Sequence, residues 1–89
     1  MFEWDPPKRL RNLRERHLDF IDAVQMFDGR PVVHAPSWKN DEDRVVSTAL
    51  IEAKFYTVVW TWRLQNRRII SFRRARDGEE RAYRNAHGQ

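Results

Sequence analysis

The sequence predicts an α+β fold in which two N-terminal helices and one C-terminal helix pack on one face of an antiparallel sheet of three to four strands. Two segments with apolar residues at helical spacing come first. Three runs dense in β-branched and aromatic residues follow, and an acidic helix start lies near the end. A chain of 89 residues can fill one core, so we expect one domain over residues 1–89.

The first segment is a short strand followed by a basic helix. Residues 2–5 alternate aromatic and acidic side chains, which predicts a strand that the two following prolines end. Asp5 is placed to cap a helix, because its carboxylate can accept from first-turn N–H groups and Pro is tolerated there. Leu10 and Leu13 then leave one narrow apolar stripe.

The second helix has the clearest pattern. Asp19 is a candidate N-cap, and Phe20, Ala23 and Phe27 recur on one face at helical spacing. Gly29 is placed to end the helix, because glycine adopts the left-handed conformation of a C-terminal cap without strain. We therefore expect a helix from residue 20 to about residue 28.

The middle of the chain predicts strands joined by tight turns. Val32–His34 begins the sheet, and residues 36–43 read as a polar loop with an acidic run. Three β-rich runs follow, Val45–Ile51, Phe55–Trp62 and Arg68–Arg73. Their connections have hairpin length, so these strands should be antiparallel neighbours.

The last segment predicts a helix that begins with acidic residues 77–80. Carboxylates at this place favour the positive end of the helix dipole. Residues 81–84 continue the helix, and we expect residues 87–89 to fray.

Cellular location follows from what the sequence lacks. There is no cysteine, which excludes a disulfide framework and a thiolate zinc site and fits a reducing compartment. The first residues are acidic and aromatic rather than signal-like, and no run is apolar for long enough to cross a bilayer. We therefore expect a cytoplasmic protein that does not enter a membrane.

The positive charge is concentrated in the C-terminal third. The net charge is +4, yet residues 1–45 hold eight basic and nine acidic side chains, whereas residues 63–89 hold eight arginines and three acids. Such a run favours a nucleic-acid partner, with aromatic residues interleaved for stacking. The alternative interpretation is a solvated surface that only keeps the protein soluble.

The available side chains restrict the chemistry. The sequence has no Gly-rich phosphate loop, no nucleophile elbow and no His-Glu-x-x-His motif, so most hydrolase classes are excluded. Arginines, histidines, tyrosines and carboxylates remain, which suffice for RNA cleavage by the ribose 2′-OH without a metal or cofactor. That reaction needs a proton acceptor, cations around the phosphate and a proton donor.

Arginine suits the phosphate because its planar fork holds two oxygens and stays charged. Arg63 and Arg73 end neighbouring predicted strands and are candidates for a phosphate clamp. They share a sheet face only if the hairpin loop between them has an odd length, whereas a two-residue loop predicts opposite faces. Four nearby arginines are expected to position RNA: Arg67, Arg68, Arg74 and Arg76.

Four other residues are candidates whose roles depend on convergence in space. His17 is a candidate because a free imidazole has a pKa of about 6.5, which suits proton transfer near neutrality, but a histidine here can equally hold carbonyls at a helix end. Tyr83 is the second proton-transfer candidate and can instead pack on the sheet. Lys8 can be a solvated helix residue, and Arg44, after three acids, can form a surface ion pair.

Several segments together resemble the BrnT family of type II toxins. These are the opening Phe2-Glu3-Trp4-Asp5-Pro6, the Thr61-x-Arg63 pair and Arg68-Ile69-Ile70-Ser71-x-Arg73-Arg74-Ala75. The resemblance runs from Phe2 to Tyr83 and implies a fold similar to RelE-type ribonucleases. The sequence departs from the family pattern at Leu18 and Ala49, where glycine is usual, and at Asp43, where glutamate is commoner.

The resemblance implies an endoribonuclease that inhibits translation and is neutralised by a BrnA-like antitoxin with a ribbon-helix-helix domain. Operator DNA would be bound only through that antitoxin. Carried over by position, the site residues are Lys8, His17, Arg44, Arg63, Arg73 and Tyr83. The rival hypothesis is a non-catalytic module whose basic surface binds nucleic acid or docks an acidic partner.

Overall fold

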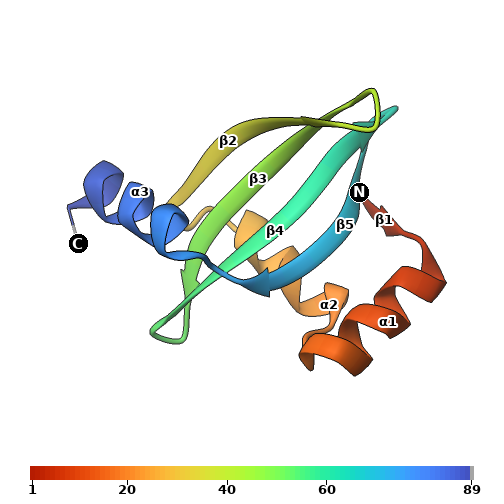
Figure 1. Ribbon diagram of the computed structural model, residues 1–89, viewed down its shortest axis with the longest axis horizontal. Helices are drawn as coiled ribbons and strands as arrows, with labels where there is room; N and C mark the ends of the chain where they lie inside the picture. Colours follow the sequence, from red (N-terminus) through yellow and green to blue (C-terminus); the bar gives the residue numbers. More distant parts are fainter. Residues whose placement is uncertain (89) are drawn as a thin grey trace.

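A five-stranded sheet lies between helices in the computed structural model, which describes residues 1–88 (Figure 1). The strand order is β1-β5-β4-β3-β2; β1 runs parallel to β5, and the other neighbours are antiparallel. The elements are β1 (Phe2–Trp4), α1 (Pro6–Arg16), α2 (Phe20–Ala23), the 3-10 helix η1 (Val24–Phe27), β2 (Val32–Lys39), β3 (Glu42–Ile51), β4 (Lys54–Arg63), β5 (Asn66–Arg74) and α3 (Asp77–His87).

The α+β class is confirmed, but the arrangement differs from the prediction in two respects. The sheet has five strands and is mixed, because the amino-terminal strand joins it in parallel beside β5. The helices also lie on both faces. Phe20 of α2 packs into the main core, whereas Tyr83 of α3 packs on Phe55, whose side chain points to the opposite face.

The face that packs against α2 and η1 is called the core face. Val58, Trp60, Ile69 and Phe72 project from it and are buried. Phe20, Ala23 and Met26 cover them from the helices. Each large apolar side chain buried in this way contributes about 1.5 to 3 kcal/mol to folding. The opposite face, called the groove face, carries Thr57, Val59, Ser71 and Arg73.

Asn12 attaches α1 to the edge of β5. Strand β1 pairs with β5 only as far as Ile69, so the backbone of Phe72 lies beyond the end of β1. The Asn12 side chain takes the place of a strand there. Its Nδ2 donates to the Phe72 carbonyl at 2.9 Å and its Oδ1 accepts from the Phe72 N–H at 3.2 Å. Nδ2 also donates to the Leu18 carbonyl at 2.8 Å, and the side chain is buried.

The polar loop predicted for residues 36–43 is instead a β-hairpin. Strand β2 extends to Lys39 and β3 begins at Glu42, with Asn40 and Asp41 as the two turn residues. Both turn residues have positive φ angles, 54° and 57°, which suit the tight turn of a two-residue hairpin. Pro36 is tolerated because β2 is an edge strand.

The predictions for the helix ends had mixed outcomes. Asp5 stands at the N-cap of α1 without a side-chain cap bond, and the second helix gives way to a 3-10 helix after Ala23. Asp19 does cap α2, accepting from the Ile21 N–H at 3.1 Å. The departures at Leu18 and Ala49 cause no backbone strain, because neither has a positive φ. The fraying expected for residues 87–89 is wrong for the first two, because His87 is the last residue of α3 and Gly88 caps the helix, its N–H donating to the Arg84 carbonyl. Gln89 lies outside the described residues.

Helix α3 is held on the groove face by an ion pair as well as by Tyr83. Arg73 contacts Glu79 through two hydrogen bonds of 2.8 Å, and this contact lowers the pKa of the Glu79 carboxyl from 4.5 to about 2. Desolvation opposes the shift but is smaller. Within residues 1–88, no helix combines the length and the hydropathy that a membrane span requires.

Replacing Asn12 with alanine should destabilise the protein by about 2 to 4 kcal/mol, because backbone groups of Phe72 and Leu18 lose their partner in a buried place. Urea unfolding measures the effect. Asn85→Ala, at an exposed site on α3, is the control for the helix propensity of alanine. Equal unfolding midpoints for the two variants would contradict the role of Asn12.

The ion pair of Glu79 should make stability depend on pH in the acid range. Because the folded pKa lies below the unfolded one, the contribution is complete above pH 4.5 and is lost as the pH falls toward 2. The stability difference between the wild-type protein and Glu79→Gln should therefore shrink across that window. Urea unfolding at several pH values tests this, and a constant difference would refute it.

Candidate functional site

A hollow of about 360 Å³ opens on the groove face between α3, the β2–β3 hairpin and the end of α1, and is called the basic groove. Its cations come from five elements or their junctions: Arg16, Lys39, Arg44, Arg73 and Arg76. The remaining lining residues are Ser37, Val46, Val59, Ile70, Ser71 and Glu79. Glu79 is the one acid of this set.

The sheet register builds the floor of the basic groove. Val46, Val59 and Ser71 are direct cross-strand partners, so their side chains form one row on the groove face. Ser37 pairs with Arg44 across the β2–β3 hairpin and lies along the same side. The β2–β3 hairpin, which the sequence predicts as a loop, therefore supplies one wall of the groove.

Two of the groove cations are held by carboxylates. Arg44 Nε donates to Glu42 at 2.9 Å, and the Arg44 side chain is only 15% exposed. Arg73 is held by Glu79 and is 11% exposed. Arg16, Lys39 and Arg76 form no ion pair with any residue between 1 and 88. The groove thus contains two arginines whose positions are fixed by ion pairs and three cations that form none with the described residues.

Two further hollows adjoin the basic groove. One, of about 160 Å³, lies along α1, is lined by Lys8 and Arg11, and shares Arg16 and Ser71 with the groove. The other, of about 460 Å³, lies between α3 and β2 and is mostly apolar, with Val33 among its lining residues. The concave surface therefore runs from α1 across β5 to α3, and it includes the predicted site residue Lys8.

Arg63 and Arg73 lie on the same face, against the prediction for a two-residue loop. The hairpin turn is indeed Leu64 and Gln65, but β5 contains one extra residue, Ile70, between the pairs Val59–Ser71 and Trp60–Ile69. This β-bulge reverses the alternation. The two arginines are still separated by six residues along β4, on the order of 20 Å, so they do not converge on one phosphate.

The proton-transfer candidates differ in accessibility. His17 is exposed at the C-cap of α1, next to Arg16, and its backbone N–H donates to the Leu13 carbonyl at 2.9 Å. Tyr83 is 2% exposed, with its ring 5.2 Å from that of Phe55. Neither residue lines the basic groove.

Of the four arginines expected to position RNA, only Arg76 lines the basic groove. Arg68 forms an ion pair with Glu3 of β1. The guanidinium carbon of Arg74 lies 5.3 Å from the centroid of the Tyr56 ring. Arg67 projects from the core face, and its guanidinium carbon lies 4.6 to 5.9 Å from four aromatic ring centroids. The rings are those of Phe2, Phe27, Trp60 and Trp62.

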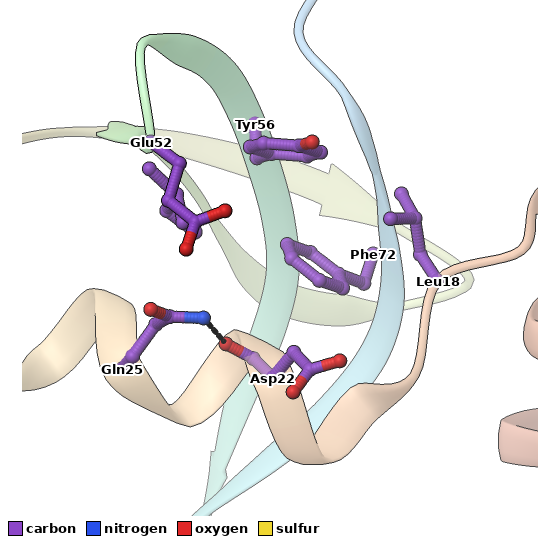
Figure 2. Close-up of a pocket in the computed structure, with 7 residues that line it drawn as sticks. Leu18, Asp22, Gln25, Glu52, Tyr56 and Phe72 are labelled. Atoms are coloured by element: carbon purple, nitrogen blue, oxygen red, sulfur yellow. Dashed lines mark hydrogen bonds between the residues drawn. The ribbon is translucent and has the colours of Figure 1, made fainter.

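A separate cavity of about 270 Å³ lies under the β3–β4 turn and has the opposite character (Figure 2). Asp22 and Glu52 contribute carboxylates to its lining, and no basic residue lines it. The Gln25 amide is used in a 2.8 Å hydrogen bond to the Asp22 carbonyl. Its acidic lining would repel a phosphate, so the basic groove is the better candidate.

Three residues that line the groove are not among the site residues that the sequence predicts: Arg16, Lys39 and Glu79. The sequence predicts a loop at Lys39, and at Glu79 it indicates only a favourable charge for the helix dipole. The sequence does contain a signal for Glu79, because the strand-end Arg73 shortly precedes an acidic helix start, in which Glu79 lies six residues after it. Residues 1–88 contain no cluster of three or more potential metal ligands among histidines, aspartates and glutamates.

Comparison with known proteins identifies the family. No curated protein matches the chain. Residues 4–79 match the family described as the ribonuclease toxin BrnT of type II toxin–antitoxin systems. The match includes α1, the whole sheet except the first residues of β1, and the start of α3 as far as Glu79. The chain therefore belongs to the BrnT family of ribonuclease toxins, as its sequence motifs indicated.

Proposed function

We propose that the protein is an endoribonuclease in which the basic groove binds the RNA backbone and Arg73 contacts the reacting phosphate. The convergence of five cations around one hollow carries the proposal, together with the membership of a ribonuclease toxin family. Three of these cations come from segments that are far apart in the sequence, Arg16, Lys39 and Arg73. Folding thus gathers positive charge that no single segment supplies.

The proposed reaction is attack of the ribose 2′-OH on the adjacent phosphorus without a metal ion. A bond forms between the 2′-oxygen and phosphorus, the bond to the 5′-oxygen breaks, and a 2′,3′-cyclic phosphate results. The 2′-OH proton passes to a base, and the departing 5′-oxygen receives a proton. Arg73 and Arg44 stabilise the charge that develops on the phosphate oxygens.

The remaining side chains take roles that follow from their positions. His17 is exposed beside Arg16 and is the candidate for proton transfer, whereas Tyr83 is buried on another element. Lys8 extends the positive surface along α1. Arg63 lies at the hairpin end and can contact only RNA that continues beyond the groove.

We further propose that a BrnA-like ribbon-helix-helix antitoxin covers the basic groove and that RNA cleavage in the cytoplasm inhibits translation. A partner antitoxin follows from the type II toxin–antitoxin family. An acidic segment laid along the groove would neutralise its unpaired cations and exclude RNA. Operator DNA would be reached only through the antitoxin, and the fold would be RelE-like.

Arg73→Lys should lower the RNA cleavage rate by about a hundredfold, because lysine keeps the charge but loses the bidentate fork. Cleavage is measured on purified protein with a chelator present, and the products are tested for 2′,3′-cyclic ends. Arg63→Lys is the matched control and should retain nearly full activity. Comparable losses in both variants would contradict the placement of the reacting phosphate at Arg73.

The same assay separates the enzyme from a non-catalytic binding module. Intact RNA after incubation with folded wild-type protein would favour the module, and cleavage that requires a divalent cation would exclude the proposed mechanism. Cleavage with chelator present and cyclic phosphate ends would support it.

Lys39→Ala should reduce the salt dependence of RNA binding. Each phosphate contact to a single strand contributes about −0.7 to the slope of log affinity against log salt, so the slope should become less steep by about that amount. The measurement uses an RNA analogue without a reactive 2′-OH. Lys54→Ala, at an exposed site beside the β3–β4 turn, is the control, and an equal change there would contradict the groove as the binding surface.

A further inference from the structure

The Glu79 carboxylate collects four hydrogen bonds at the rim of the basic groove. Arg73 Nη1 and Nη2 donate to its two oxygens, each at 2.8 Å. Thr57 Oγ1 of β4 donates at 3.0 Å, and the backbone N–H of Arg76 donates at 2.8 Å. Strands β4 and β5 and the N-cap of α3 therefore fix this carboxylate, which leaves it little freedom to move.

The orientation of Arg73 decides what its guanidinium can still bind. Its end edge, formed by Nη1 and Nη2, is occupied by Glu79, and Nη1 also donates to the Arg74 carbonyl at 3.3 Å. The side edge consists of the Nε–H and the second N–H of Nη2. Among the residues that the structure describes, no acceptor contacts Nε of Arg73. That edge has the spacing for two phosphate oxygens.

The other bidentate arginine–carboxylate pairs between residues 1 and 88 have the opposite arrangement. Arg9 contacts Asp19 through Nε and Nη2, and Arg30 contacts Asp28 through the same two nitrogens. In both, the carboxylate occupies the side edge. Arg73 differs from them in leaving this edge open while lining a basic groove.

We infer that Glu79 is a positioning residue, which holds Arg73 by the end edge of its guanidinium and presents the side edge to an RNA phosphate. The inference rests on the proposed function and deepens it. A long arginine side chain on a strand would otherwise sample many rotamers, and ordering it before RNA arrives removes that entropic cost from the reaction. The negative charge of Glu79 is tolerated because four other cations line the groove.

The test compares Glu79→Gln with Glu80→Gln. Both remove one carboxylate from α3, but Glu80 pairs with Arg84 on the same helix and does not line the groove. Glu79→Gln should lower kcat for RNA cleavage by about a hundredfold, the effect of a small misplacement of a reacting group. KM should stay equal or fall, because the groove loses a negative charge. Glu80→Gln should change neither constant.

A double variant shows whether Glu79 acts through Arg73. In the Arg73→Lys background, the further change Glu79→Gln should have almost no effect on kcat, because the fork that Glu79 orients is already lost. Glu79→Asp, which keeps the charge on a shorter side chain, should recover part of the activity. Circular dichroism and urea unfolding confirm that each variant is folded under the assay conditions.

A binding measurement separates this inference from the proposed function. The NMR signal of the Arg73 Nε–H should shift when an RNA analogue without the reactive 2′-OH is added to the wild-type protein, and the shift should vanish in Glu79→Gln. A shift without any cleavage activity would support the inference and refute the endoribonuclease. Normal kcat in folded Glu79→Gln, increased kcat, or an unshifted Nε–H signal would each overturn the inference.

Discussion

The hydrogen bonds between the Asn12 side chain and the Phe72 backbone join α1 to the sheet at the place where β1 has ended. A central strand would otherwise leave buried backbone groups without partners, which is costly. The same contact holds α1 against β5. The helix ends at His17, which has the left-handed conformation of a C-cap, and its last residue, Arg16, lines the basic groove. The Asn12 amide thus both satisfies the backbone at the edge of β5 and holds α1, which carries Arg16, beside the groove.

The β-bulge at Ile70, two residues before Phe72 in β5, also determines which side chains reach the basic groove. It restores Arg63 to the face that carries Arg73 although the hairpin turn has two residues. It also lets Ile70 and Ser71 both line the groove, beside α1. Bulges of this kind bend a strand and re-aim its side chains. Here the basic groove forms where the bulged strand, α1 and α3 meet.

The arginine-rich C-terminal third separates into residues with different surroundings. Arg67 is enclosed by aromatic rings on the core face, Arg68 is paired with Glu3, and Arg73 and Arg76 line the groove. Adjacent residues of a strand point to opposite faces, so a run of arginines cannot act as one surface. Lys39, at the end of β2 in the β2–β3 hairpin, completes the groove from outside that run.

The sequence by itself determined the α+β class, the element order, the β4–β5 hairpin and the family, because these depend on local periodicity and on motifs of neighbouring residues. Tertiary structure decided the parallel pairing of β1, the face occupied by α3, and which cations share one groove. These features depend on contacts between residues distant in the chain, such as Asn12 with Phe72, and on a bulge whose single extra residue reverses side-chain direction. No local pattern encodes either.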